Sequence, residues 1–294
     1  MKENKGGSRN RYRMSDFTAI KIGVVPNASK RYRLTKEQKL KFFELDQHFI
    51  KRLFFDIETS PMVVYSWRIG YNLSITPDNI INEWKIICIS YKWEHENEVK
   101  HFTWDENQDE KQMLIDFINI ANQADELVAH NGDRFDIKKI RTRCVFHRIP
   151  MFPKYRTLDT LTKSKSAFNF SSNKLDYIAK FLGVGAKLQH EGFPMWVKCL
   201  QNDKQALKDM VKYCDMDIVV LEDVFLTLQS YIKPNTHAGV VVGGTKRDCP
   251  ICASSNVSLL KNDVTEKGTI SRVMECQSCG HNYNISNSAY KMNL

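Results

Sequence analysis

The stretch Leu53-Phe54-Phe55-Asp56-Ile57-Glu58-Thr59 places two acidic residues within and just after an apolar run. Leu53 to Ile57 is predicted to be a buried strand, because Asp56 is its only polar residue. Residues two apart on a strand point to the same face, so Asp56 and Glu58 are expected to lie together. Burying a carboxylate is costly unless it is paired or bound to a cation. The pattern therefore indicates a divalent metal site at the end of a core strand.

The composition favours a protein with one large core and a smaller appendage. The chain has 294 residues, of which 42% are hydrophobic and 26% charged. Apolar runs stay well short of the ~20 residues that span a bilayer. Because the first thirty residues also lack an apolar signal core, we expect a cytoplasmic protein.

The positive charge is concentrated at the start of the chain. Residues 1–52 hold 14 Lys and Arg against 5 Asp and Glu, which accounts for the whole net charge of +9. A basic arm beside an acidic metal site is consistent with a protein that binds a polyanion, such as nucleic acid, close to the carboxylates. A solvated, disordered tail is the alternative for residues 1–20. The capping-box spacing at Thr35 to Gln38 predicts a helix from about Lys36 to Ile50.

Residues 51–232 alternate predicted strands and helices. Further strands are expected at 85–91, 98–104 and from 126, with a short strand or helix start at 158–160. Helices are expected at 108–121, 136–146, 175–182 and about 203–231, while 187–196 is irregular. A meander followed by a returning strand and helices predicts an α/β fold, with a mixed sheet flanked by helices.

Three later segments offer partners for the two acids. Residues 131–136 lie where a strand passes into a helix, an edge at which α/β proteins bind ligands. Tyr213 and Asp217 are four apart in the long helix and share a face. Asp215 falls on a different face and is expected to be solvated. Leu158-Asp159-Thr160 is a weaker third candidate.

The order and spacing of these residues resemble a known family. Asp56-Ile-Glu58-Thr, Asn131-x3-Phe-Asp136 and Tyr213-x3-Asp217 are similar to the three motifs of the DEDD superfamily of ribonuclease H-like 3′–5′ exonucleases. The histidine subclass of that superfamily has His five residues before the last Asp, where this chain has Lys212, so the tyrosine subclass fits.

The resemblance extends over roughly residues 50–232. It is to the proofreading domains of family-B DNA polymerases and to stand-alone phage and bacterial exonucleases. Since no polymerase domain follows residue 232 in this sequence, a proofreading role would need a replication-protein partner.

The resemblance implies roles for individual residues. Two Mg²⁺ or Mn²⁺ ions would be held by Asp56, Glu58, Asp136 and Asp217, with Asp136 acting directly or through water. Tyr213 would orient the attacking water, since its ordinary pKa near 10 makes it a poor base.

The implied reaction is hydrolysis of DNA from single-stranded 3′ ends, in replication or repair, and in the host cytoplasm if the protein is phage-encoded. RNA 3′-end trimming and a nucleic-acid-binding polymerase accessory subunit are the alternatives.

Four residues are weaker candidates for substrate contacts. The resemblance implies that Thr59 contacts the 3′ end of the strand and that Asn131 contacts a phosphate. Turn formation explains the presence of Asn131 equally well. Trp67 and Arg68 belong to a stretch of interleaved aromatic and basic residues that could stack bases and contact phosphates. A packed excursion is the alternative for that stretch.

The C-terminal cysteines indicate a zinc ribbon. Cys249 and Cys252 form one Cys-x2-Cys pair, Cys276 and Cys279 form another, and 23 residues separate the pairs. Four thiolates around Zn²⁺ would close the site, so the zinc would be structural. Nucleic acid and a protein partner are equally open as ligands of this module. The expected division of the chain is a basic arm and helix (1–50), a nuclease domain (51–232), a linker (233–246) and a zinc ribbon (247–294).

Overall fold

The computed structural model describes residues 12–13, 24–25, 31–32, 50–70, 72–94 and 96–291. Two short strands in the first part, β1 (Tyr12–Arg13) and β2 (Arg31–Tyr32), pair with each other. The helix predicted from about Lys36 to Ile50 lies outside the described residues, except for Ile50 itself.

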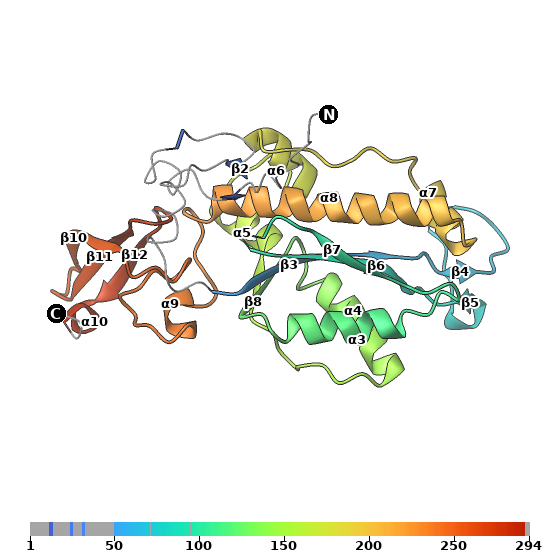
Figure 1. Cartoon of the computed structure of the whole chain (residues 1–294), viewed down its shortest axis with the longest axis horizontal. Coiled ribbons are helices and arrows are strands. Elements are labelled where there is room, and N and C mark those ends of the chain that lie inside the picture. The colour runs from blue at the N-terminus through green and yellow to red at the C-terminus, as the bar shows by residue number, and fades with distance from the viewer. Residues whose placement is uncertain are drawn as a thin grey trace, which may run out of the picture.

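A five-stranded mixed sheet forms the centre of the molecule (Figure 1). Its order is β7-β6-β3-β8-β9. The first three strands form the antiparallel meander, and β8 and β9 run parallel to β3. The five strands are β3 (Arg52–Thr59), β6 (Ile86–Trp93), β7 (Lys100–Thr103), β8 (Glu126–Ala129) and β9 (Thr157–Asp159).

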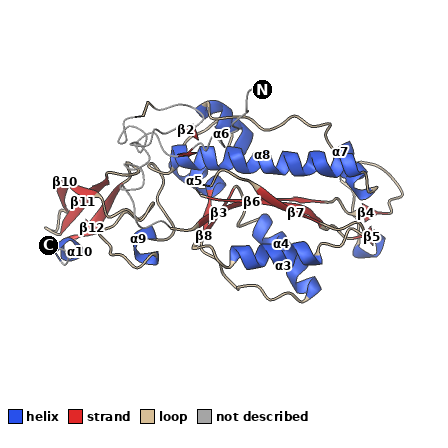
Figure 2. Ribbon diagram, viewed as in Figure 1, coloured by secondary structure: helices blue, strands red, loops and turns tan. Residues whose placement is uncertain are grey.

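Helices cover both faces of this sheet, as Figure 2 shows. One face carries α3 (Lys111–Ala121) and α4 (Asp136–His147), and the other carries α8 (Lys204–Leu228). The predicted mixed sheet flanked by helices is thereby confirmed.

Side chains alternate along β3, so its odd-numbered and even-numbered residues pack on opposite faces of the sheet. Leu53, Phe55 and Ile57 enter the core that includes residues of α3 and α4. Phe54 enters the core on the opposite face, where Phe225 of α8 lies against it in an edge-on ring contact at 5.5 Å. Because alternate residues share a face, the acids that follow Phe54 at positions 56 and 58 also point toward α8. The strand thus directs both carboxylates to the longest helix of the protein.

The remaining core elements agree with the sequence at most positions. The helix α6 (Leu175–Leu182) ends at Gly183, whose φ of 67° is left-handed. Helix α8 begins after Asp203, whose carboxylate accepts hydrogen bonds from the backbone N–H of Gln205 and Ala206. The stretch 187–196 is irregular only to residue 193, because α7 (Pro194–Leu200) begins with a proline that presets a helical φ. The other short elements are β4 (Val63–Val64), η1 (Pro77–Asn79), β5 (Ile80–Asn82) and α5 (Thr160–Ala167).

The C-terminal part is a three-stranded antiparallel sheet at one end of the molecule (Figure 1). Its order is β10-β11-β12, so β12 is an edge strand. The segment expected to be a linker contains the short helix α9, and the N–H of Ala238 donates to the carbonyl of Pro250 at 2.9 Å. The elements are α9 (Ala238–Val241), β10 (Val257–Val264), β11 (Ile270–Cys276), β12 (Asn282–Ser286) and α10 (Asn287–Lys291).

Within the described ranges, every helix is too short or too polar to cross a membrane.

Candidate active site

Three of the four predicted acids meet between β3 and α8. One carboxylate oxygen from each of Asp56, Glu58 and Asp217 lies within 4.8 Å of the others. Asp217 is only 3% exposed, and its Oδ1 has no hydrogen-bond partner in the described part of the chain. A buried, unsatisfied carboxylate oxygen facing two more carboxylates is a coordination position for a hard cation. The donor set therefore fits Mg²⁺ or Mn²⁺.

The electrostatics of this cluster favour a bound cation. The pKa of Asp56 is raised well above its ordinary value by burial first, and then by Asp136, Asp217 and Glu58. Burial, together with the charge on Asp217, raises the pKa of Glu58 to about 8. Like-charged carboxylates in a region of low dielectric resist ionising together, and a divalent cation removes that resistance.

Asp136 lies next to this cluster but outside it. The residue opens α4, and its Oδ1 accepts a hydrogen bond from the N–H of Ile57 at 3.2 Å, from the residue between the two acids of β3. Burial raises the pKa of Asp136 to about 7, although two backbone hydrogen bonds act in the opposite direction. Its charge is the strongest of the carboxylates acting on Asp56. Asp136 is thus close enough to Asp56 for their charges to interact, and its role as a ligand stays a prediction.

Tyr213 lies one helical turn before Asp217 and shares its face of α8. Its hydroxyl lies beside the Asp217 carboxylate, because the ammonium of Lys187 donates hydrogen bonds to both groups. Burial, followed by the charge on Asp217, raises the pKa of Tyr213 to about 12. The phenol therefore stays protonated at neutral pH, as a group that positions a ligand and does not act as a base.

Lys187 is the main residue that the sequence analysis missed. Its ammonium donates a hydrogen bond to Oδ2 of Asp217 and a second, at 3.2 Å, to the hydroxyl of Tyr213. Burial lowers its pKa, but the charge and hydrogen bond of Asp217, together with Tyr213 and Asp56, hold the pKa above the ordinary value. Lys187 belongs to the stretch read as irregular, and a lone lysine in a loop gives no pattern by which it could have been found.

An aromatic wall stands beside Tyr213. The ring of His190 lies 4.8 Å from the ring of Tyr213, and Trp196 of α7 lies 6.3 Å from it. Trp196 also lies near Glu58, where it acts to lower the pKa of that carboxyl against the larger effect of burial. The irregular stretch and α7 thus close the site on the side of Tyr213.

Asp215 is only partly solvated, with 26% of its side chain exposed, where the sequence predicted a solvated residue. Its Oδ1 accepts a hydrogen bond from the hydroxyl of Ser90 at 2.7 Å, and its Oδ2 lies 3.2 Å from Nδ1 of His101. The reason is the length of the sheet: β6 and β7 extend under α8, so a second face of the helix is also covered. Asp215 contributes to packing α8 on the sheet and does not enter the acidic cluster.

The weaker candidate segments shape the turn after β8. Asn131 has a φ of 72°, and its N–H donates to Oδ1 of Asp159 at 2.9 Å. The same oxygen caps α5 by accepting from the N–H of Leu161. Asp159 is therefore engaged in holding this turn, and Asn131 has the left-handed backbone that turns require. Its predicted phosphate contact stays a prediction.

The other predicted substrate contacts lie at or beyond the end of β3. Thr59 is the last residue of the strand and follows an irregularity in its pairing with β6. Trp67 and Arg68 are exposed, and the side chain of Trp67 is fully so. The excursion thus presents its tryptophan to solvent, which contradicts inward packing for that residue.

The four C-terminal cysteines converge as predicted for a metal centre. Their sulfurs all lie within 4.8 Å of one another, with 3.6 Å between Cys249 and Cys279 and between Cys252 and Cys276. A tetrahedral zinc site with Zn–S bonds of about 2.3 Å has sulfurs separated by nearly 4 Å. Hydrogen bonds from the other three thiols hold the pKa of Cys276 far below its usual range. The cluster fits one Zn²⁺ ion.

Comparison with known proteins agrees with this fold. A family model described as the RNase_H superfamily matches residues 77–229, more than half of the chain, and the protein belongs to this superfamily. The matched range includes Asp136, Tyr213 and Asp217 and begins after Asp56 and Glu58. The expected ribonuclease H-like fold is therefore confirmed, and at the family level it supports a nuclease.

Among solved structures, 112 chains match. One of them is the family B DNA polymerase from the hyperthermophilic archaeon Pyrobaculum calidifontis, with a TM-score of 0.47 and 16% sequence identity. The match covers 62% of this chain and 25% of that chain, so the region of likeness spans a quarter of the polymerase. The search of curated proteins gives no match.

Proposed function

We propose that the protein is a metal-dependent 3′–5′ exonuclease that hydrolyses phosphodiester bonds at single-stranded DNA ends. The observation that carries this proposal is the convergence of Asp56, Glu58 and Asp217, with the hydroxyl of Tyr213 linked to Asp217 through Lys187. The order of the acids along the chain and the spacing of Tyr213 and Asp217 support the tyrosine subclass of the DEDD exonucleases.

The residues of the chain divide the chemistry among them. Asp56, Glu58 and Asp217, with Asp136 beside them, would hold one or two divalent cations. When bound, such ions supply Lewis-acid stabilisation of the charge that develops on the phosphodiester oxygens. Tyr213 would orient the attacking water through its hydroxyl, and Lys187 would hold Tyr213 and Asp217 in register through its two hydrogen bonds.

The cysteine cluster and the termini complete the proposal. Four thiolates with no fifth ligand position would make the zinc structural. We propose residues 51–232 as the nuclease domain and 247–294 as the zinc ribbon, with 233–246 between them and a basic arm at 1–50. Thr59, Asn131, Trp67 and Arg68 are proposed contacts of the DNA strand.

The test is a degradation assay with Mg²⁺ on end-labelled DNA and RNA, single- and double-stranded. The proposed function predicts stepwise loss of nucleotides from the 3′ end of single-stranded DNA. Asp56→Ala and Asp217→Ala should each abolish activity, while the matched control Asp215→Ala, two residues away on the same helix, should retain it. Retained activity in either acid variant would refute the metal assignment. Preference for RNA, or binding without cleavage, would select one of the two alternative functions.

A further inference from the structure

A cleft of about 930 Å³ lies between the end of α8 and the edge strand β12. The chain that leaves α8 supplies one wall and β12 supplies the other. It is lined by residues 230–237, Val240, Lys246, Pro250, residues 281–286 and Ala289. The cleft thus lies where the part of the chain with the acids meets the part with the four cysteines.

The lining is positively charged. Lys233 and Lys246 are exposed, and within the described ranges neither has an ion-pair partner. None of the lining residues is Asp or Glu. A cleft with lysines and no carboxylates attracts an anionic ligand.

A third lysine stands at its rim. Lys163 of α5 donates a hydrogen bond to Oδ1 of the lining residue Asn235 at 2.6 Å. Its pKa is lowered by burial first, and the charge of Lys233 also lowers it, while Glu126 acts in the opposite direction. Two ammonium groups that repel each other at a rim are stabilised when an anion binds between them.

The cleft also offers an aromatic face and amide groups. Tyr231 is 72% exposed. Asn282 and Asn284 are exposed and alternate with buried residues along β12, so their side chains share one face. An exposed aromatic ring can stack a base of any identity, and amides can donate to or accept from bases and phosphates.

We propose that this cleft binds single-stranded nucleic acid, with a base stacked on Tyr231 and phosphates beside Lys233 and Lys246. The position suits a strand that also reaches the acids. Asp217 lies fourteen residues before Tyr231, which corresponds to about 20 Å along a helix.

A second cleft next to the acids is lined by three lysines and one acid, Asp176. Lys165 of α5 lines this cleft of about 660 Å³, together with Lys174 and with Lys187 of the acidic site. Helix α5 therefore joins the two clefts through Lys163 and Lys165. The inference rests on the proposed function for the direction of the strand, whose 3′ end would lie at the acids and whose preceding nucleotides would lie in the cleft.

The test measures binding of a 5′-labelled oligothymidylate of about 16 nucleotides to the full chain by fluorescence anisotropy, without added Mg²⁺, over a range of salt concentrations. In the double variant Lys233→Ala/Lys246→Ala the slope of log Kd against log salt should fall by about 1.4, because each phosphate contact on a single strand contributes about 0.7. The double variant Lys261→Ala/Lys267→Ala removes the same charge from the exposed hairpin of β10 and β11, and it should keep the wild-type slope. Unchanged zinc content checks that both variants are folded.

A separate pair of variants tests the stacking contact. Tyr231→Ala should weaken binding roughly 5- to 150-fold, the effect of losing one base–aromatic stack, and Tyr231→Phe should restore it. The inference would be overturned if the two double variants had equal slopes, or if Tyr231→Ala bound the oligonucleotide as wild type does. Binding of an extended peptide along β12 in place of the oligonucleotide would also overturn it. Cleft-dependent binding without any nuclease activity would overturn the proposed function alone. Nuclease activity with cleft-independent binding would overturn this inference alone.

Discussion

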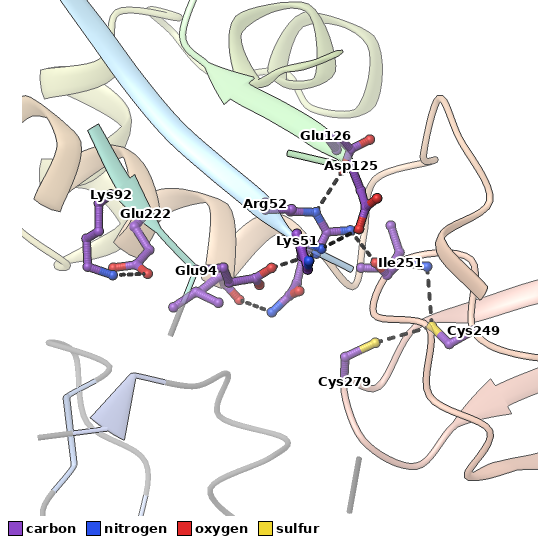
Figure 3. A network of polar contacts seen from close by, with 12 residues as sticks. Lys51, Arg52, Lys92, Glu94, Asp125, Glu126, Glu222, Cys249, Ile251 and Cys279 are labelled. Atoms are coloured by element: carbon purple, nitrogen blue, oxygen red, sulfur yellow. Dashed lines mark hydrogen bonds and ion pairs between the residues drawn. The ribbon is translucent and has the colours of Figure 1, made fainter. Parts of the chain in front are cut away.

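Arg52 donates a hydrogen bond from its guanidinium to the backbone carbonyl of Ile251, which lies between the cysteines of the first Cys-x2-Cys pair (Figure 3). The same guanidinium bonds Glu126 at 2.7 Å and Glu94 at 3.0 Å. Arg52 is 2% exposed and begins β3, the strand that carries two of the three clustered acids. The first cysteine pair is thus attached to the central strand of the sheet through one buried cation.

Arg52→Met should therefore destabilise the protein strongly. The variant leaves Glu126 buried without its cation, and removing one partner of a buried ion pair costs about 3–5 kcal/mol. Urea unfolding measures the change. Lys180→Met, which removes the exposed pair with Asp176, is the control and should cost less than about 1 kcal/mol. Equal losses in the two variants would mean that the Arg52 network contributes no more than a surface pair.

Cys249→Ser should release zinc and unfold the C-terminal module alone. The module has few buried apolar residues, so four thiolates around Zn²⁺ supply much of its folding free energy. Metal analysis gives the zinc content, and hydrogen exchange reports each part of the chain separately. We expect fast exchange in residues 247–291 and protection retained in β3, β6 and α8. Loss of protection in those core elements would show that the proposed division of the chain is wrong.

The sequence predicted the central strand of the sheet well, because the apolar residues of β3 are buried as their pattern requires. An apolar strand interrupted by one acid is expected to place that acid where its charge can be compensated, and Asp56 lies beside Glu58 and Asp217, where a bound cation would do so. The helix α6 was equally predictable, because Gly183 marks its end. These are local signals, and they do not depend on which elements pack together.

The errors concern contacts between distant segments. Asp215 looked solvated because helical periodicity gives the face of a residue but not what covers that face. Ser90 and His101 come from strands more than a hundred residues earlier. Lys187 reaches Asp217 across 30 residues from a loop without periodicity. Asp136 accepts a hydrogen bond from the backbone of Ile57, a contact that its motif does not indicate, while its role as a metal ligand stays a prediction.

Tyr213→Phe should slow the reaction by about 10²-fold, the usual effect of losing one oriented hydrogen-bonding group at a reaction centre. The ring keeps its contacts with His190 and Trp196, so the site stays closed. Single-turnover cleavage of a labelled strand measures the rate, and Mn²⁺ titration should give unchanged binding. Tyr155→Phe removes a hydroxyl that bonds Asn122 and serves as the control. A wild-type rate in Tyr213→Phe would remove the tyrosine from the mechanism.

Lys187→Met should lower activity and also change how the site binds metal. The ammonium neutralises Asp217 when no cation is bound, so it competes with a divalent ion for that carboxylate. We expect tighter Mn²⁺ binding in the variant, measured by calorimetry, together with a lower cleavage rate because Tyr213 loses its partner. Lys174→Met, in the neighbouring cleft, controls for the loss of a positive charge. Weaker Mn²⁺ binding in Lys187→Met would show that the lysine supports the metal site instead of competing with it.

The raised carboxylate pKa values predict how stability depends on pH. Glu58, with a folded pKa of about 8, holds its proton in the folded chain up to a higher pH than in the unfolded chain, where its pKa is near 4. Between about pH 5 and 8 the folded state thus binds more protons, and this group's contribution to the free energy of unfolding falls as the pH rises. His130 and His281 act oppositely, because burial lowers their pKa values. The measurement is therefore the difference in the free energy of unfolding between wild type and Glu58→Gln. Without added Mg²⁺, wild type should lose stability relative to this variant as the pH rises from 5 to 8. Excess Mg²⁺ should reduce that loss. If the stability difference between the two proteins stays constant or changes in the opposite direction, Glu58 is not held protonated in the folded chain.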